Sequence, residues 1–157
     1  MARELAMGLM FQHQAAGRNA NVKECVKLFE QNFNPKNDDE QALSIDLADF
    51  EQAWPMAKEL FVGAVKRLGQ LDRDIGRAAK NWRLTRISPV DLSLLRLAYY
   101  EMLYRDDIPL LVSLNEAIEI AKSFGDNDSF AFINGILDKL LEGVKAPSTA
   151  PPKVEGL

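Results

Sequence analysis

The side chains that carry most enzyme chemistry are scarce in this sequence of 157 residues. It has one histidine, His13, and one cysteine, Cys25. A structural zinc site needs more ligands of this kind, and no residue near His13 suggests a partner that would orient it for nucleophilic catalysis. We therefore interpret His13 as a surface or capping residue. Cys25 lies on an apolar helical stripe and is interpreted as a buried, unreactive thiol.

The sequence also lacks the glycine-rich motifs that hold nucleotide phosphates. Neither G-x-x-x-x-G-K-S/T nor G-x-G-x-x-G occurs in it. With no candidate nucleophile, metal site or cofactor loop, the sequence predicts a protein that is not an enzyme.

Charged residues are unevenly distributed along the chain. The net charge is −4 and the pI about 5.1, which argues against indiscriminate binding of nucleic acid. Residues 37–51 contain six carboxylates and no base, whereas residues 65–86 contain seven bases and two acids. Within the basic segment, Arg73, Arg77 and Lys80 share one helix face. This side can face phosphate groups, or it can be an ordinary solvated helix face.

Apolar residues recur at helical spacing through most of the chain, and no strand pattern appears. Pro55 suits a first turn, so we expect a helix to begin there. Ser88 and Pro89 in "SPVD" are a start signal for a nearly all-apolar helix, which we place at the centre of the fold. A second capping box, "SLNE", predicts the start of the next helix. The expected helices span residues 2–14, 21–33, 55–82, 89–104, 113–124 and a last one from Asp126 or Asp128 to about 142. Gly69 and Gly76 are positions at which the long run at 55–82 can bend or break into two helices.

These signals predict an all-α fold, a compact bundle of about seven helices, in one domain at residues 1–143. Residues 34–46, "NPKNDDEQALSID", are polar and acidic and are expected to form a surface loop. Residues 144–157 are rich in proline and small side chains and are expected to be disordered. No apolar run is long enough to span a bilayer and no signal peptide is recognisable, so we expect a cytoplasmic protein.

The dipeptide Asn134-Gly135 is a turn signal that lies within a helical pattern. A glycine inside a helix costs about 0.8–1 kcal/mol relative to alanine. We therefore expect Gly135 to allow close packing against the central helix. The same spacing directs Phe130 and Ile133 inward and leaves Phe132 facing outward.

Six short motifs follow one another in the second half of the chain: "SPVD", "LRLAYYE", "DDIP", "NEAIEIAKSFG", "DNDS" and "FINGILDK". In this order and at this spacing they closely resemble the C-terminal half of the NusB family of bacterial transcription antitermination factors. The segments "ARELAMGLMFQHQ" and "ELFVGAVKRLGQLDRDI" resemble the first and third helices of that family. The likeness covers most of residues 2–142.

The resemblance implies an all-helical fold of two packed subdomains and a function without covalent chemistry. NusB-like proteins pair with NusE, a small-subunit ribosomal protein, and the pair binds the boxA sequence of nascent RNA. In this way they help RNA polymerase read through terminators, notably in ribosomal RNA operons. An alternative is a protein-interaction scaffold that recruits NusE and makes little RNA contact of its own. The apolar first helix would also permit a homodimer that masks the RNA site.

By the same resemblance, the RNA-binding positions of the family correspond to Arg3, Asp128 and Phe132, and its NusE-binding positions to Phe11 and Asp91. An exposed Phe132 would stack on an unpaired base, and a guanidinium binds phosphate. Only Arg3 stands where family members carry several arginines, which favours the scaffold alternative. Structural roles are open for all five: a terminal charge for Arg3, helix capping for Asp91 and Asp128, and core packing for Phe11 and Phe132.

Overall fold

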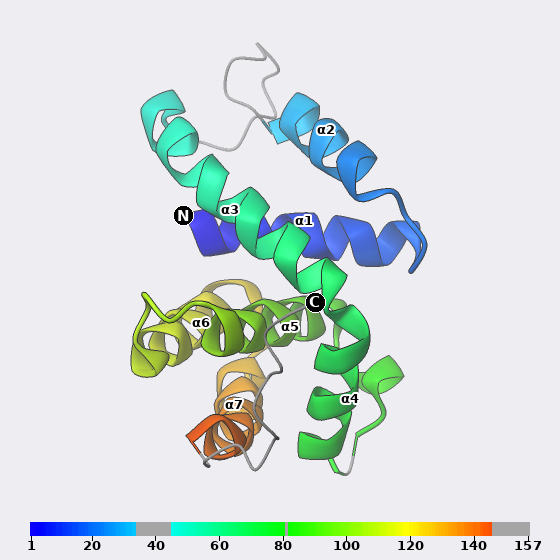
Figure 1. The fold of residues 1–157 in the computed structure, drawn as a ribbon, viewed down its shortest axis with the longest axis vertical. Helices are drawn as coiled ribbons and strands as arrows, with labels where there is room; N and C mark the ends of the chain where they lie inside the picture. The colour runs from blue at the N-terminus through cyan, green and yellow to red at the C-terminus, as the bar shows by residue number, and fades with distance from the viewer. Residues whose placement is uncertain (34–44, 81, 146–157) are drawn as a thin grey trace, which may run out of the picture.

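The computed structural model describes residues 1–33, 45–80 and 82–145, and every regular element within these ranges is a helix (Figure 1). The elements are α1 (Ala2–Ala16), α2 (Val22–Phe33), α3 (Leu47–Lys66), α4 (Leu68–Ala78), the 3₁₀-helix η1 (Leu84–Arg86), α5 (Pro89–Tyr104), α6 (Leu110–Phe124) and α7 (Ser129–Lys145). The all-α fold predicted from the sequence is confirmed. The loop expected at 34–46 and the tail expected at 144–157 lie largely outside the described residues.

Helix α5 lies at the centre and joins two groups of helices. On one side, α1 and α3 pack against each other and against α5, and α2 packs on α1 and α3 (Figure 1). On the other side, α4, α6 and α7 each pack against α5, and α7 also contacts α4 and α6. Each group covers part of the central helix, which is the two-part arrangement that the family resemblance implies.

The composition of α5 explains its central place. Its side chains are buried all round the helix, among them Leu92, Leu95 and Met102. The N-cap Ser88 accepts a hydrogen bond at 3.1 Å from the third backbone N–H of the helix, and Pro89 occupies the first position, as predicted. A helix that is apolar on every face is stable only when other helices surround it.

Helix α3 begins at Leu47 rather than at Pro55, so the predicted start is wrong. Asp46 caps the helix by accepting a hydrogen bond at 2.7 Å from a backbone N–H in the first turn. Phe50 and Trp54 are buried in the turns before the proline, and Trp54 stacks on an aromatic ring of α2. This packing and the cap hold the segment helical although Pro55 removes one backbone donor inside it.

Two other helix boundaries also differ from the prediction. The long helix expected to run to residue 82 is interrupted at Arg67, which ends α3 and precedes α4. Helix α6 begins at Leu110, before the expected capping box, and the hydroxyl of Ser113 is buried without a hydrogen-bond partner among the described residues. Within the same residues, no helix is both long and apolar enough to cross a membrane.

His13 is buried, which contradicts its prediction as a surface or capping residue. Its side chain is 1% exposed and its ring packs edge-on against Phe61, with the ring centroids 5.8 Å apart. Burial lowers the pKa of this imidazole. The prediction failed because α1 lies between α3 and α5, so even residues near its end are inside the fold. Cys25 is buried as predicted, and burial raises the pKa of its thiol.

The Asn134-Gly135 pair lies within α7, but Gly135 is not a packing residue. It is exposed, and a Cβ atom built on it would meet no atom within 4 Å. Phe130, which was expected inside, is 43% exposed, whereas Phe132 is half-buried. The two phenylalanines flank the buried stripe of α7 on opposite edges, and Trp82 packs on the edge that carries Phe132. Periodicity alone does not tell which edge a neighbouring segment covers.

Candidate binding surfaces

The RNA-binding positions predicted in α7 lie around a hollow of about 350 Å³ on the surface of the molecule. It is bounded by the segment at 82–91 and by the start of α7. Asp128 and Phe132 line it together with Asp91, which the sequence assigned to the partner surface. The structure therefore brings three of the five predicted residues to one place, and its volume is in the range of small-ligand sites.

Two aromatic rings meet at this hollow. Trp82, which is 52% exposed, packs edge-to-face against Phe132 with ring centroids 6.0 Å apart and an angle of 69° between the rings. Sequence reasoning missed Trp82 as a site residue. The available signal was a tryptophan between two bases, Lys80 and Arg83, close to a predicted helix end. An exposed tryptophan presents a large flat face that a ligand can cover.

Asp91, which the resemblance assigned to NusE binding and for which helix capping was the alternative, is 8% exposed at the start of α5. Its Oδ2 atom accepts a hydrogen bond at 3.2 Å from the hydroxyl of Ser129, and that hydroxyl accepts one at 2.9 Å from the backbone N–H of Asp126. These bonds join the start of α5 to the start of α7. The Oδ1 atom of Asp91 is buried without a hydrogen-bond partner among the described residues.

Asp128 immediately precedes α7 and is exposed. Its backbone carbonyl accepts a hydrogen bond at 3.1 Å from the backbone N–H of Phe132, which closes the first turn of the helix. The side chain makes no hydrogen bond or ion pair with the described residues, so it is available to a ligand. The RNA-binding roles of Asp128 and Phe132 stay predictions.

Arg3 is held in an ion pair, not in the exposed terminal position considered from the sequence. Its guanidinium donates to both carboxylate oxygens of Glu101 in α5, at distances of 2.6 to 3.1 Å. Glu101 is 2% exposed and Arg3 is 22% exposed. A second carboxylate, that of Glu116 in α6, lies 3.7 Å from Arg3. The hydrogen bond to Glu101 is the main reason why the pKa of Arg3 is raised. Arg3 thus ties α1 to α5.

Arg73, Arg77 and Lys80 are exposed, but only Arg73 and Arg77 lie on α4, because that helix ends at Ala78 and Lys80 follows it. Arg77 lies 3.6 Å from the carboxylate of Asp74, three residues before it. The other two make no ion pair with the described residues. A pair of this kind on an exposed helix surface contributes little to stability, so this face remains available to a partner.

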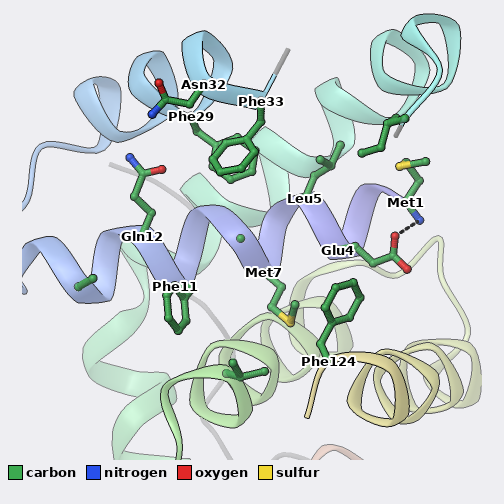
Figure 2. A pocket seen from close by; sticks show the side chains of 14 residues that line it. Met1, Glu4, Leu5, Met7, Phe11, Gln12, Phe29, Asn32, Phe33 and Phe124 are labelled. Atoms are coloured by element: carbon green, nitrogen blue, oxygen red, sulfur yellow. Dashed lines mark ion pairs between the residues drawn. The ribbon is translucent and has the colours of Figure 1, made fainter. Parts of the chain in front are cut away.

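Phe11, predicted to contact NusE, lies at an apolar groove of about 640 Å³ along α1 (Figure 2). Helix α2 forms one wall through Phe29 and Phe33, and Phe124 at the end of α6 points in from the opposite side (Figure 2). Phe11 and Phe124 are among the exposed large apolar side chains of the molecule. Val90, next to Asp91 in sequence, also lines the groove, so the two predicted partner-binding residues lie on adjoining surfaces.

No cluster of three or more histidine, cysteine or acidic side chains in the described part of the chain has the arrangement of a metal site. The groups that line the two surfaces are aromatic rings, carboxylates, a guanidinium group and apolar side chains.

The sequence model of the NusB family matches residues 1–142 of this chain. The chain belongs to the NusB family. It is 40% identical over 142 residues to the transcription antitermination protein NusB of Geobacter sp. (strain M21), and the aligned part covers 90% of this chain and 92% of that protein.

Solved structures agree with this assignment. NusB of T. maritima is similar with a TM-score of 0.72 and 32% sequence identity, over 90% of this chain and 88% of that one. A crystal structure of the antitermination factors NusB and NusE in complex with dsRNA has a TM-score of 0.70 and 20% identity, over 90% and 94% of the two chains. At this lower identity the likeness shows the fold alone.

Proposed function

We propose that this NusB family member is a transcription antitermination factor that pairs with NusE, binds boxA of nascent ribosomal RNA and promotes read-through by RNA polymerase. The observation that carries the proposal is its 40% identity, over 90% of the chain, to a protein named transcription antitermination protein NusB. The fold is also that of a NusB solved together with NusE and dsRNA. The protein acts by binding and not by catalysis, and it works in the cytoplasm, where transcription takes place.

The hollow beside α7 is the proposed RNA surface. Phe132 and Asp128 line it, and single-stranded RNA is commonly bound by stacking bases on aromatic rings and by hydrogen bonds to base edges. Arg3 contributes to RNA binding mainly through position, because Glu101 already occupies its guanidinium and holds α1 in place.

The groove along α1 is the proposed NusE surface. Phe11 offers an apolar anchor beside Phe124, and protein interfaces concentrate their binding energy in such aromatic side chains. Asp91 is buried at the edge of the adjoining hollow, so its contribution is to fix the relation between α5 and α7 rather than to meet a basic partner in solution.

The scaffold alternative has its own supporting observation. The guanidinium that the family resemblance assigns to RNA is engaged by Glu101, and Asp91, Asp126 and Asp128 surround the hollow with negative charge. Both features weaken attraction to phosphate. A protein of this kind would recruit NusE and leave most of the RNA contact to it.

Binding of a boxA-like single-stranded RNA over a salt series separates the two functions. We expect weak binding by this protein alone and markedly tighter binding with NusE, with a salt slope that reports a few phosphate contacts. Phe132→Ala should weaken the ternary complex about tenfold, whereas Phe130→Ala, an exposed phenylalanine on the same helix, serves as the matched control. If the ternary complex is no tighter than NusE with RNA, the scaffold function is the correct one.

The partner surface is tested in the same way without RNA. Phe11→Ala should weaken NusE binding by about tenfold or more, because it removes an aromatic anchor. Leu111→Ala is the matched control, since Leu111 is an exposed apolar residue of α6 that does not line the groove. Equal affinities for both variants and the wild-type protein would refute this placement.

A further inference from the structure

The lining of the hollow beside α7 combines aromatic, acidic and basic side chains. Trp82 and Phe132 contribute aromatic rings, whereas Asp91, Asp126 and Asp128 contribute carboxylates. Of the bases in the segment before α5, Arg86 lines it. RNA binding in general requires an aromatic face and positive charge, but not a group of carboxylates.

We propose that this hollow holds one unpaired base that carries an exocyclic amino group, with cytosine preferred over uracil, and that Trp82 is its stacking platform. The inference rests on the RNA-binding function proposed above. It adds a base preference and two residues, Trp82 and Arg86, that the family resemblance did not assign.

Trp82 is suited to stacking because half of its surface is open. It is 52% exposed although Phe132 packs against it, and the 69° angle between the two rings shows that they are not stacked face to face. Phe132 is half-buried and acts as a support that holds the indole in place. Because Phe132 already holds Trp82 in place, the tryptophan side chain loses little further conformational entropy when a base stacks on it.

The carboxylates select the edge of the base. Asp126 and Asp128 are exposed, and neither side chain makes a hydrogen bond or ion pair within the described part of the chain. Asp91, more than nine-tenths buried, adds a carboxylate whose Oδ1 atom has no partner there. Carboxylates only accept hydrogen bonds, so they favour the N4 amino group of cytosine and disfavour the O4 carbonyl of uracil.

The basic side chains in and beside the hollow can bind the phosphates. Arg83 and Arg86 are exposed and form no ion pair with the described residues, and Lys80 lies just before Trp82 in the same segment. A nucleotide can therefore place its base among the carboxylates and its phosphates on the guanidinium groups. A basic peptide would meet these same cations and be repelled, and a free phosphate would be repelled by the carboxylates.

The preference is measured with oligo(rC) and oligo(rU) of equal length, each bound to the wild-type protein in complex with NusE. The bases of these two RNAs differ only at the 4-position and the adjacent ring nitrogen. The ratio of the two affinities therefore reports how the protein recognises that edge of the base. We expect oligo(rC) to bind about fivefold tighter. Asp128→Asn should bring the ratio close to one, because an amide offers a donor as well as an acceptor.

The stacking platform is tested separately. Trp82→Ala should weaken oligo(rC) binding about tenfold, and Trp82→Tyr should restore most of it, because stacking needs an aromatic face and not indole in particular. Arg86→Ala should reduce the salt slope by about one. Lys27→Ala, the loss of an exposed charge on the distant helix α2, is the control and should leave the slope unchanged.

Tryptophan fluorescence can detect contact between Trp82 and the RNA directly. The sequence has two tryptophans, and Trp54→Phe leaves Trp82 as the only one. Oligo(rC) should then quench the tryptophan fluorescence at the same concentrations at which it binds. The inference is overturned if the complex binds RNA but Trp82→Ala and oligo(rU) match the wild-type protein and oligo(rC). If the wild-type complex binds neither these RNAs nor boxA-like RNA, the proposed function fails, and the inference fails with it.

Discussion

The ion pair between Arg3 and Glu101 gives the sharpest prediction for stability. Glu101 is 2% exposed, and both of its oxygens accept hydrogen bonds from Arg3, so Arg3→Ala leaves a buried carboxylate without its main partner. Breaking a buried pair costs about 3–5 kcal/mol, and the partial exposure of Arg3 places this case near 3 kcal/mol. For a chain of 157 residues, that loss lowers Tm by about 6–12 °C.

The assay is thermal unfolding followed by circular dichroism at 222 nm. Glu116→Ala is the control, because Glu116 is half exposed and lies 3.7 Å from Arg3, a pair that contributes less than about 1 kcal/mol. The double variant Arg3→Leu with Glu101→Leu should recover most of the stability, since apolar residues can replace a buried pair. If Arg3→Ala lowers Tm no more than Glu116→Ala does, the reasoning is refuted.

The same variants separate a structural role of Arg3 from direct RNA contact. If Arg3 acts through the position of α1, the double variant folds and binds RNA almost as the wild-type protein does. If Arg3 binds phosphate, the double variant folds but binds RNA weakly, and the salt slope falls by about one.

Four further outcomes are expected. Gly135→Ala should raise the free energy of unfolding by about 0.8–1 kcal/mol in urea titrations, because the new methyl group meets nothing and the helix gains a better former. Gly63→Ala should lower it by about 1–3 kcal/mol, because the hydroxyl end of Tyr100 occupies the place of the new Cβ atom. Burial lowers the pKa of His13 below its ordinary value of 6.5, so the unfolded chain binds the proton more tightly than the native protein does. The free energy of unfolding should therefore fall as the pH drops below about 6.5. His13→Leu should flatten this pH dependence, and an unchanged pH profile in that variant would contradict the prediction. The thiol of Cys25 is buried and its pKa is raised, so it should react with a disulfide reagent much more slowly in the native protein than in urea.

Much of the fold follows from local signals in the sequence. The cap at Ser88 and the apolar composition of α5 predict both the start and the central place of that helix. The predicted start of α3 at Pro55 is wrong because a proline inside a helix is rare, and the burial of Phe50 and Trp54, together with the Asp46 cap, explains why the helix continues through it. Such burial depends on contacts between helices that are distant in sequence.

The candidate surfaces were predictable to a smaller extent. Asp128 and Phe132 are found together as the family resemblance implied, but Trp82 comes from a segment far away in sequence. The burial of Asp91 and the pairing of Arg3 with Glu101 depend on how α5 meets α7 and α1, which no periodicity records. Residues that meet only through contacts between distant helices are the part of a site that is hardest to predict from a single sequence.

The central claim is that this protein promotes antitermination through NusE and RNA. Its most direct test is transcription by purified RNA polymerase across a terminator placed downstream of a boxA sequence, with this protein and NusE added separately and together, in the presence of the other factors of the antitermination complex. We expect read-through that requires both proteins and a functional boxA, and that falls with Phe132→Ala but not with Phe130→Ala. Read-through that is unaffected by omitting this protein would contradict it.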